Sequence, residues 1–311
     1  MLIGIEFMIN NISNCSELPL VSVGVFTYRR PESLRRTLES LVNQTYQNLE
    51  IIVSDNASPG DETEKVMQYF LNRDSRIKYF RQSTNIGPYL NAQFVLDKAI
   101  GEYFMWSSDD DWHELECIAE LQKAISADSS AVTSFAYFDI RTETGEQVFG
   151  YPDPSLALKK MAGEREIQRQ LDFYLLRDGH SIPHVFYGLI RRKILSGFNL
   201  VQFIKRYGTY GSDSLLVFWL LKQGKVALVE KVLFGFTFGN VKHYTYSEAS
   251  SYLLRRLSVF FQQCRYIASF ALLATGITRL FVLFFLPWKL LEISTLLLIS
   301  PFKRILIKFE G

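Results

Sequence analysis

The sequence has little net charge and few cysteines, and each shortage excludes a class of protein. Lys and Arg outnumber Asp and Glu by only two in 311 residues, so the chain lacks the basic excess of nucleic-acid-binding domains. Cys15, Cys117 and Cys264 lie far apart, without zinc-site spacing, and their odd number argues against a disulfide framework. We therefore expect no nucleic-acid partner and a cytoplasmic protein.

Several sequence signals are also absent. Residues 1–20 lack the basic start of a signal peptide. There is no internal repeat, no glycine-rich dinucleotide fingerprint and no Walker phosphate loop. Any bound phosphate must therefore be neutralised by a metal ion, or by Arg or Lys. No uninterrupted apolar run reaches the 18–20 residues that mark a clear membrane span.

What the sequence does contain is a large apolar fraction, 48%, arranged in alternating patterns. Short apolar runs predict strands, and apolar residues at helical spacing predict helices between them. The predicted strands cover 20–26, 49–53, 77–80 and 102–106, and the helices cover 31–45, 61–71 and 88–100. This alternation predicts an α/β fold with a mostly parallel sheet and helices on both faces.

Three consecutive carboxylates, Asp109, Asp110 and Asp111, follow the fourth predicted strand. Three adjacent negative charges are costly unless a cation or solvent screens them. Carboxylate oxygens suit Mg²⁺ or Mn²⁺, and Mg²⁺ commonly uses one or two carboxylates together with substrate phosphates. Taken alone, the tripeptide fits a solvated acidic turn that caps the next helix better than a metal site, and the polar residues earlier in the chain favour the metal site.

Polar residues also follow the other predicted strands. Thr27, Tyr28 and Arg30 offer a hydroxyl, a ring face and a guanidinium that pairs with phosphate. Asp55 could accept hydrogen bonds from a nucleotide or form an Asx turn. Because ligands bind outside the carboxyl ends of the strands in open α/β sheets, we expect these clusters to converge on one edge.

In order and spacing, residues 20–125 resemble the family-2 glycosyltransferases, which have the GT-A fold. The matching segments are 21–31, 51–58, 85–87, 99–103 and 109–111. The resemblance implies a Rossmann-like sheet, a nucleotide-sugar donor (a UDP-sugar is expected), Mn²⁺ or Mg²⁺, and inversion at the anomeric carbon. Phe26, Arg29 and Leu90 depart from the family pattern.

The resemblance also assigns roles by position. The residues it places around the nucleotide sugar are Thr27, Tyr28, Arg30, Asp55, Asn85, Asp109 and Asp110. It implies that Asp109 and Asp111 bind the metal, and Asp213 is the implied catalytic base. His243 is a further metal candidate, with a surface-loop role as its alternative. Asp213 could also be the N-cap of the apolar helix predicted at 215–221.

The remaining chain gives weaker predictions. We expect an N-terminal extension over 1–19, a nucleotide-sugar-binding subdomain over 20–125 and an acceptor-binding, catalytic subdomain over 126–248. Within the last of these, we predict a strand at 131–140, an irregular segment at 151–162, and a loop carrying His180 and His184 before an apolar strand at 185–190. The two histidines are candidates for contact with the acceptor or for metal binding.

The last part of the chain, 249–311, is a hydrophobic helical tail. Arg279, Lys289 and Glu292 interrupt its apolar runs, and Pro287 is expected to break or kink a longer helix. We predict helices that lie on a membrane surface, with Arg279, Lys289 and other cations reaching the headgroups. The alternatives are one spanning helix over 267–286, or packing against the catalytic domain or a second copy.

Together these features predict an inverting, metal-dependent glycosyltransferase of surface polysaccharide or glycan synthesis. Its acceptor would be a saccharide or a lipid-linked sugar, and it would lie peripherally on the inner face of the cell membrane. A homo-oligomer is compatible with the sequence. The alternatives are a sugar nucleotidyltransferase and a catalytically silent, membrane-bound partner of another transferase.

Overall fold

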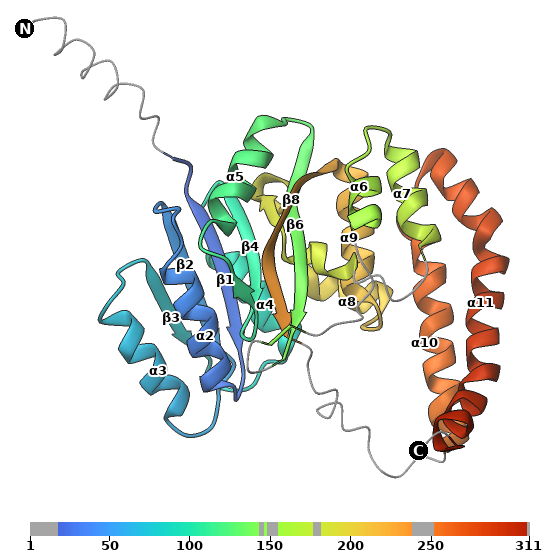
Figure 1. The fold of residues 1–311 in the computed structure, drawn as a ribbon, viewed down its shortest axis with the longest axis horizontal. Coiled ribbons are helices and arrows are strands. Elements are labelled where there is room, and N and C mark those ends of the chain that lie inside the picture. Colours follow the sequence, from blue (N-terminus) through green and yellow to red (C-terminus); the bar gives the residue numbers. More distant parts are fainter. Residues whose placement is uncertain (1–17, 143–145, 148–154, 177–181, 238–251, 310–311) are drawn as a thin grey trace, which may run out of the picture.

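The computed structural model describes residues 18–142, 146–147, 155–176, 182–237 and 252–309 (Figure 1). These residues form a sheet with helices on both faces, in the strand order β3-β2-β1-β4-β7-β6-β8-β5. The strands are β1 (Val21–Thr27), β2 (Leu49–Asp55), β3 (Ile77–Arg81), β4 (Tyr103–Ser108), β5 (Trp112–His113), β6 (Ala131–Arg141), β7 (Leu189–Arg191) and β8 (Lys225–Thr237).

The helices alternate with the strands in the first half and cluster in the second. They are α2 (Pro31–Val42), α3 (Glu62–Leu71), α4 (Pro88–Lys98), α5 (Cys117–Ala127), α6 (Ser155–Met161), α7 (Glu166–Leu175), α8 (Leu200–Tyr207), α9 (Ser212–Gln223), α10 (Tyr252–Leu273) and α11 (Gly276–Phe309). Two short 3₁₀ helices, η1 (Ile182–Tyr187) and η2 (Arg192–Leu195), flank β7.

Strands β3, β2, β1 and β4 form the parallel half of the sheet, as the sequence predicted. Nearly every residue of β1 and β2 is buried, which matches their continuous apolar runs and the helices on both faces. The register places Thr27 opposite Asp55, and Phe26 opposite Ser108. The carboxyl ends of three neighbouring strands therefore lie side by side.

The second half of the sheet has mixed directions. Strand β7 runs antiparallel to β4 and β6, β6 pairs in parallel with β8, and β5 runs antiparallel to β8. The strand predicted at 131–140 is confirmed by β6. The strand predicted at 185–190 is wrong in its first half, because residues up to Tyr187 belong to η1. Pro183 lies in this turn, and a proline cannot donate to a strand ladder.

The segment predicted to be irregular, 151–162, contains helix α6 instead. Its buried side chains are Ala157, Leu158 and Met161, which share one helical face. Asp61 and Glu64 have the spacing of a capping box at the start of α3, but the Asp61 side chain makes no capping hydrogen bond.

Helices α10 and α11 form a hairpin at the end of the molecule away from β3, and pack beside α7, α8 and α9 (Figure 1). Packing on the rest of the chain, one of the alternatives for the tail, is confirmed. The window 267–286 is not one helix, because the chain turns at Ala274 and Thr275, and Gly276 has a left-handed φ of +52°. The predicted break at Pro287 does not occur within α11.

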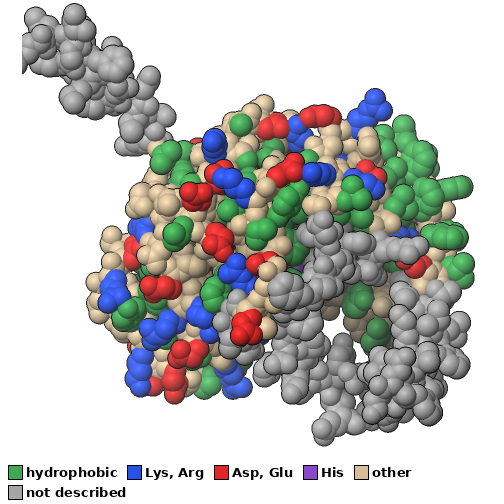
Figure 2. Space-filling view, in the orientation of Figure 1, with side chains coloured by type: hydrophobic (Ala, Val, Ile, Leu, Met, Phe, Trp, Pro, Cys, Tyr) green, Lys and Arg blue, Asp and Glu red, His purple; other side chains and the backbone are tan. Residues whose placement is uncertain are grey.

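No helix among the described residues combines the length and the apolarity needed to cross a bilayer. Apolar side chains nevertheless gather at the end of the surface where the hairpin lies (Figure 2). Lys289 does not belong to that surface, because only 8% of it is exposed. Its Nζ donates to the Leu176 carbonyl at 2.9 Å and pairs with Glu292 at 3.3 Å. The prediction that Lys289 reaches lipid headgroups is therefore wrong, since it fastens α11 to the end of α7.

Asp128 and Lys225 join the loop before β6 to the start of β8, with Oδ2 and Nζ 2.7 Å apart. The hydrogen bond from Lys225, with one from Ser130, lowers the pKa of Asp128 to about 2. Because this pKa lies below that of the unfolded chain, the pair stabilises the fold above about pH 4 and loses this effect as the pH falls towards 2.

We expect Asp128→Asn to lower the free energy of unfolding by about 0.5–1 kcal/mol at pH 7, since both groups are partly exposed. Urea unfolding at pH 7 and pH 2.5 checks this, because the difference between the two proteins should shrink at the lower pH. An equal difference at both pH values would contradict the assignment.

Candidate active site

The polar clusters that follow β1, β2 and β4 meet at the carboxyl edge of the sheet, as predicted. Thr27 ends β1 opposite Asp55, the last residue of β2, and Asp109 directly follows β4. The Thr27 hydroxyl donates to Asp109 Oδ2 at 2.7 Å. Asn85 joins the same edge through Asn56, whose Nδ2 donates to Asn85 Oδ1 at 3.0 Å.

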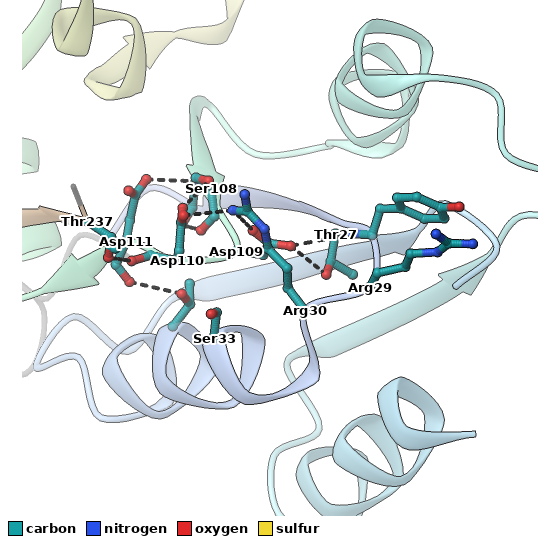
Figure 3. A network of polar contacts seen from close by, with 12 residues as sticks. Thr27, Arg29, Arg30, Ser33, Ser108, Asp109, Asp110, Asp111 and Thr237 are labelled. Atoms are coloured by element: carbon teal, nitrogen blue, oxygen red, sulfur yellow. Dashed lines mark hydrogen bonds and ion pairs between the residues drawn. The ribbon is translucent and has the colours of Figure 1, made fainter. Parts of the chain in front are cut away.

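The three acids form the short connection between β4 and β5, and neighbouring elements hold its backbone (Figure 3). The Thr237 hydroxyl, from the end of β8, donates to the Asp110 carbonyl at 2.5 Å. The Thr37 hydroxyl, from α2, donates to the Asp111 carbonyl at 2.9 Å. Pairing of β5 with β8 fixes the far end of the connection. The acids are thus presented by a braced backbone.

Arg30 lies across two of the acids (Figure 3). Its Nη1 is 3.2 Å from Asp109 Oδ1 and 2.7 Å from Asp110 Oδ2. Asp110 also accepts a hydrogen bond from the Ser108 hydroxyl at 2.6 Å. The Arg30 side chain is 43% exposed, so its guanidinium is accessible to an anion at this edge.

Burial makes the negative charges of the acid cluster unfavourable, and Arg30 compensates them only in part. Burial and the neighbouring Asp110 raise the pKa of Asp109 to about 6, although Arg30 and the Thr27 hydrogen bond oppose the shift. Burial and the charge of Asp110 also raise the pKa of Asp111 well above its usual value. Within the described part of the chain, no Lys or Arg forms an ion pair with Asp111. Its Oδ2 accepts a hydrogen bond from the Ser108 backbone N–H at 3.0 Å.

This electrostatic pattern fits a divalent cation. The donors are hard carboxylate oxygens, and a bound cation would relieve the repulsion that raises both pKa values. No group of three or more His, Cys, Asp or Glu residues within the described ranges is arranged to enclose a metal by itself. A magnesium site completed by substrate phosphates needs only one or two carboxylates. His243, the other predicted metal ligand, lies outside the described residues.

Asp55 is fully buried and already has partners. Its Oδ1 accepts from the Ser58 N–H at 2.9 Å, so the side chain holds the loop that follows it, although through the third residue and not the second, as an Asx turn would. Its Oδ2 accepts from the Tyr79 hydroxyl at 3.3 Å and lies 3.7 Å from Arg81 Nε. Asn85 Oδ1 likewise accepts from the Gly87 N–H at 2.9 Å, which shapes the turn before α4. Both side chains are therefore held in fixed orientations.

The structure places two of the residues that depart from the family pattern, Arg29 and Leu90. Arg29 adopts a left-handed φ of +61°, and its backbone N–H donates to the Ser58 hydroxyl at 2.9 Å. Its guanidinium lies 5.0 Å from the centre of the Tyr28 ring, a cation–π contact that occupies one face of that ring. Leu90 is 47% exposed on α4.

A cavity of about 370 Å³ lies between the ends of β1 and η1 and the starts of α4 and α9. Aromatic side chains line much of it, together with the carboxylate of the predicted base; they include Phe26, Tyr89, Phe186, Tyr187 and Asp213. Phe26, which also departs from the family pattern, therefore forms part of the cavity wall.

One prediction allowed Asp213 to be the N-cap of α9, and that prediction is wrong. Gly211, with a left-handed φ of +62°, occupies that position, and Asp213 lies in the first turn. The Asp213 side chain is exposed, and its Oδ1 accepts from the Ser214 N–H at 3.0 Å. Asp213 is therefore a carboxylate that a ligand in the cavity can reach.

Tyr187 is a site residue that the sequence did not reveal. Burial raises its pKa well above the usual value, and the charges of Asp111, Asp213 and the other two acids raise it further. Its hydroxyl therefore remains a neutral donor, and Tyr187 lines the same cavity as Asp213. The surrounding apolar run gave no signal of this, because it has the pattern of a buried strand.

His184, a candidate for acceptor contact, packs against aromatic rings of the sheet. Its ring centre lies 4.2 Å from that of Phe236 and 5.0 Å from that of Phe138. His180 lies outside the described residues.

Comparisons with known proteins agree with this architecture. The model of the family "Glycosyl transferase family 2" matches residues 22–197. A Campylobacter jejuni protein, GalNAc(5)-diNAcBac-PP-undecaprenol beta-1,3-glucosyltransferase, is 42% identical over 95 residues. That match covers 30% of this chain and 30% of the relative, so the chain spans less than a third of that protein's length.

Solved structures share the fold at low sequence identity. Staphylococcus aureus TarS in complex with UDP-GlcNAc gives a TM-score of 0.59 at 17% identity, over 83% of this chain and 68% of that one. The Pyrobaculum calidifontis mannosyltransferase PcManGT, in complex with GDP-Man and Mn²⁺, gives 0.53 at 14% identity, over 95% and 80%. Since the family model matches more than half of this chain, the chain belongs to glycosyl transferase family 2.

Proposed function

We propose that this protein transfers a sugar from a nucleotide-sugar donor to a saccharide or lipid-linked acceptor in the synthesis of a surface glycan. The observation that carries the proposal is the geometry at the end of β1, where Thr27 bonds to Asp109 of the acid cluster and the adjacent Phe26 lines the cavity that also carries Asp213. The name of the Campylobacter relative includes an undecaprenol-linked acceptor, and TarS was solved with UDP-GlcNAc. Both support the substrate classes.

The donor would bind at the carboxyl edge of the 20–125 subdomain, and the acceptor would approach from the 126–248 subdomain. The residues proposed to hold the nucleotide sugar are Thr27, Tyr28, Arg30, Asp55, Asn85, Asp109 and Asp110. Arg30 would exchange its pairing with Asp110 for the donor diphosphate, since guanidinium groups pair well with phosphate. A UDP-sugar is the proposed donor.

Asp111 and Asp109 would hold Mn²⁺ or Mg²⁺. When bound, such an ion stabilises the negative charge that develops on the leaving diphosphate. The raised pKa values of both groups fall when a cation binds, because the cation favours the ionised carboxylates. With a metal on these acids and the donor phosphates attracting the guanidinium, Arg30 would be freed from its pairing with Asp109 and Asp110.

Asp213 is the proposed general base. Its exposed carboxylate would accept the proton of the acceptor hydroxyl as that oxygen attacks the anomeric carbon and the nucleoside diphosphate departs. Such a direct displacement inverts the anomeric carbon and needs only one base. Tyr187 would donate a hydrogen bond within the same cavity.

A panel of nucleotide sugars, tested by thermal shift with and without Mn²⁺, checks the donor assignment. We expect one donor to raise the melting temperature only when Mn²⁺ is present, by about 2–4 °C for each kcal/mol of ligand stabilisation. Incubation with that donor should release a nucleoside diphosphate, whereas pyrophosphate release would indicate a nucleotidyltransferase. A folded protein that responds to no donor would favour the catalytically silent partner.

The proposed location is peripheral, on the inner face of the cell membrane, where a lipid-linked acceptor would be available. A homo-oligomer is compatible with this arrangement.

A further inference from the structure

Helix α11 leaves a continuous apolar face uncovered. Its exposed large apolar side chains are Ile277, Leu280, Phe281, Leu283, Phe284, Trp288 and Leu291. Their spacing of three or four residues places most of them on one side of the helix, over about four turns. Phe284 is 75% exposed and Trp288 is 67% exposed. A contiguous patch of this kind marks an interaction surface, unlike single exposed apolar residues.

This face is not the one that holds the hairpin to the rest of the protein. The opposite side of α11 carries the buried residues Thr278, Val282 and Lys289. Lys289 is bonded to the end of α7, so the inner face already has its partner. The outer face is therefore additional apolar surface, and packing of the described fold does not require it.

The face also contains an apolar hollow of about 530 Å³. Its walls are formed by Leu175, Phe284, Phe285, Pro287, Trp288 and Leu291. None of the described residues that line it is charged, and these walls suit a hydrocarbon chain better than a polar ligand.

The distribution of charge identifies the occupant. Residues 252–292 contain five Lys and Arg and one acid, Glu292, which pairs with the buried Lys289, although the whole chain has an excess of only two positive charges. Arg265 and Arg279 are exposed on the hairpin itself. An anionic bilayer complements this cationic, apolar element. In a symmetric dimer the same face would meet itself, which would bring like charges together.

We propose that the outer face of α11, from Ile277 to Leu291, docks on an anionic lipid bilayer, with the hollow beside Trp288 receiving a hydrocarbon chain. This inference rests on the proposed function, because it names the surface that would bring the enzyme to a lipid-linked acceptor. The helix would lie in the plane of the interface, where Trp and Phe are favourable and Arg279 can reach anionic headgroups.

Flotation of the full chain with vesicles of 70% phosphatidylcholine and 30% phosphatidylglycerol tests the proposal. We expect the wild type to float with these vesicles and much less with pure phosphatidylcholine. The double variant Phe284→Ser/Trp288→Ser should bind at least tenfold more weakly, and Arg279→Gln about fivefold more weakly at low salt. Tyr69→Ser is the matched control, because Tyr69 is an exposed aromatic residue on α3, at the far end of the molecule (Figure 1).

Circular dichroism and thermal melting establish that each variant is folded, which the exposure of the substituted side chains favours. Equal flotation of the wild type and the double variant would overturn the proposal. So would a wild type that does not float and is a dimer by light scattering, if the double variant is a monomer, because the face would then bind a second copy. Flotation uses no nucleotide sugar, so its failure would leave the proposed transfer reaction standing.

Discussion

Asp213→Asn is expected to lower the transfer rate by about 10²–10⁴-fold while leaving the donor affinity unchanged. The amide cannot accept the proton of the acceptor hydroxyl, but its oxygen can still accept the hydrogen bond from the Ser214 N–H. The side chain is exposed, so the fold should lose only the small interaction of a negative charge with the start of α9, about 0.3–1 kcal/mol. The measurement is the single-turnover rate with saturating donor, alongside thermal shift with the same donor.

Asp61→Asn provides a matched control for this prediction. Asp61 also lies at the start of a helix and is exposed, but it belongs to α3 and pairs with Lys65. The control should retain the full transfer rate. If Asp213→Asn kept more than a tenth of the wild-type rate, another group would have to serve as the base. Loss of donor binding in the same variant would instead assign Asp213 to the donor site.

The parallel half of the sheet and the polar residues at its carboxyl edge could be predicted from the sequence, because both depend on local patterns. Continuous apolar runs such as Ile51–Val53 occur where a strand is covered on both faces, and the acids follow such a run directly. Parallel pairing then aligns strand ends without information about distant residues. This is why Thr27, Asp55 and Asp109 could be placed together before any contact was known.

Tyr187 and Lys289 show where local patterns are insufficient. The run around Tyr187 has the composition of a strand, and its 3₁₀ turn depends on how it packs between β4 and α9. Lys289 interrupts an apolar stretch and so resembles a cation directed at solvent or headgroups. It is buried because the end of α7 presents a free carbonyl at Leu176, which only the tertiary arrangement supplies. Both errors arise from partners that are distant in sequence.

Asp111→Asn should have opposite effects on activity and on the stability of the ligand-free protein. Without the negative charge, we expect Mn²⁺-dependent donor binding to weaken and transfer to fall by about 10²–10³-fold. The amide oxygen can still accept the hydrogen bond from the Ser108 N–H, so the variant loses the charge and keeps this bond. The pKa of Asp111 is higher in the folded protein than in the unfolded chain. The protonated carboxyl therefore stabilises the wild-type fold at low pH, and this stabilisation is lost as the pH rises.

The neutral variant lacks this titration, so the ligand-free protein should be as stable as the wild type near pH 4 and more stable at pH 7. Urea unfolding at both pH values, without metal, measures this difference. Asp128→Asn is the informative comparison, because it removes a structural acid and should destabilise the protein at pH 7 without slowing transfer. A destabilised, fully active Asp111→Asn would mean that the carboxylate serves the fold. A more stable and inactive one would mean that its charge is retained for the cation and the donor, at the expense of stability.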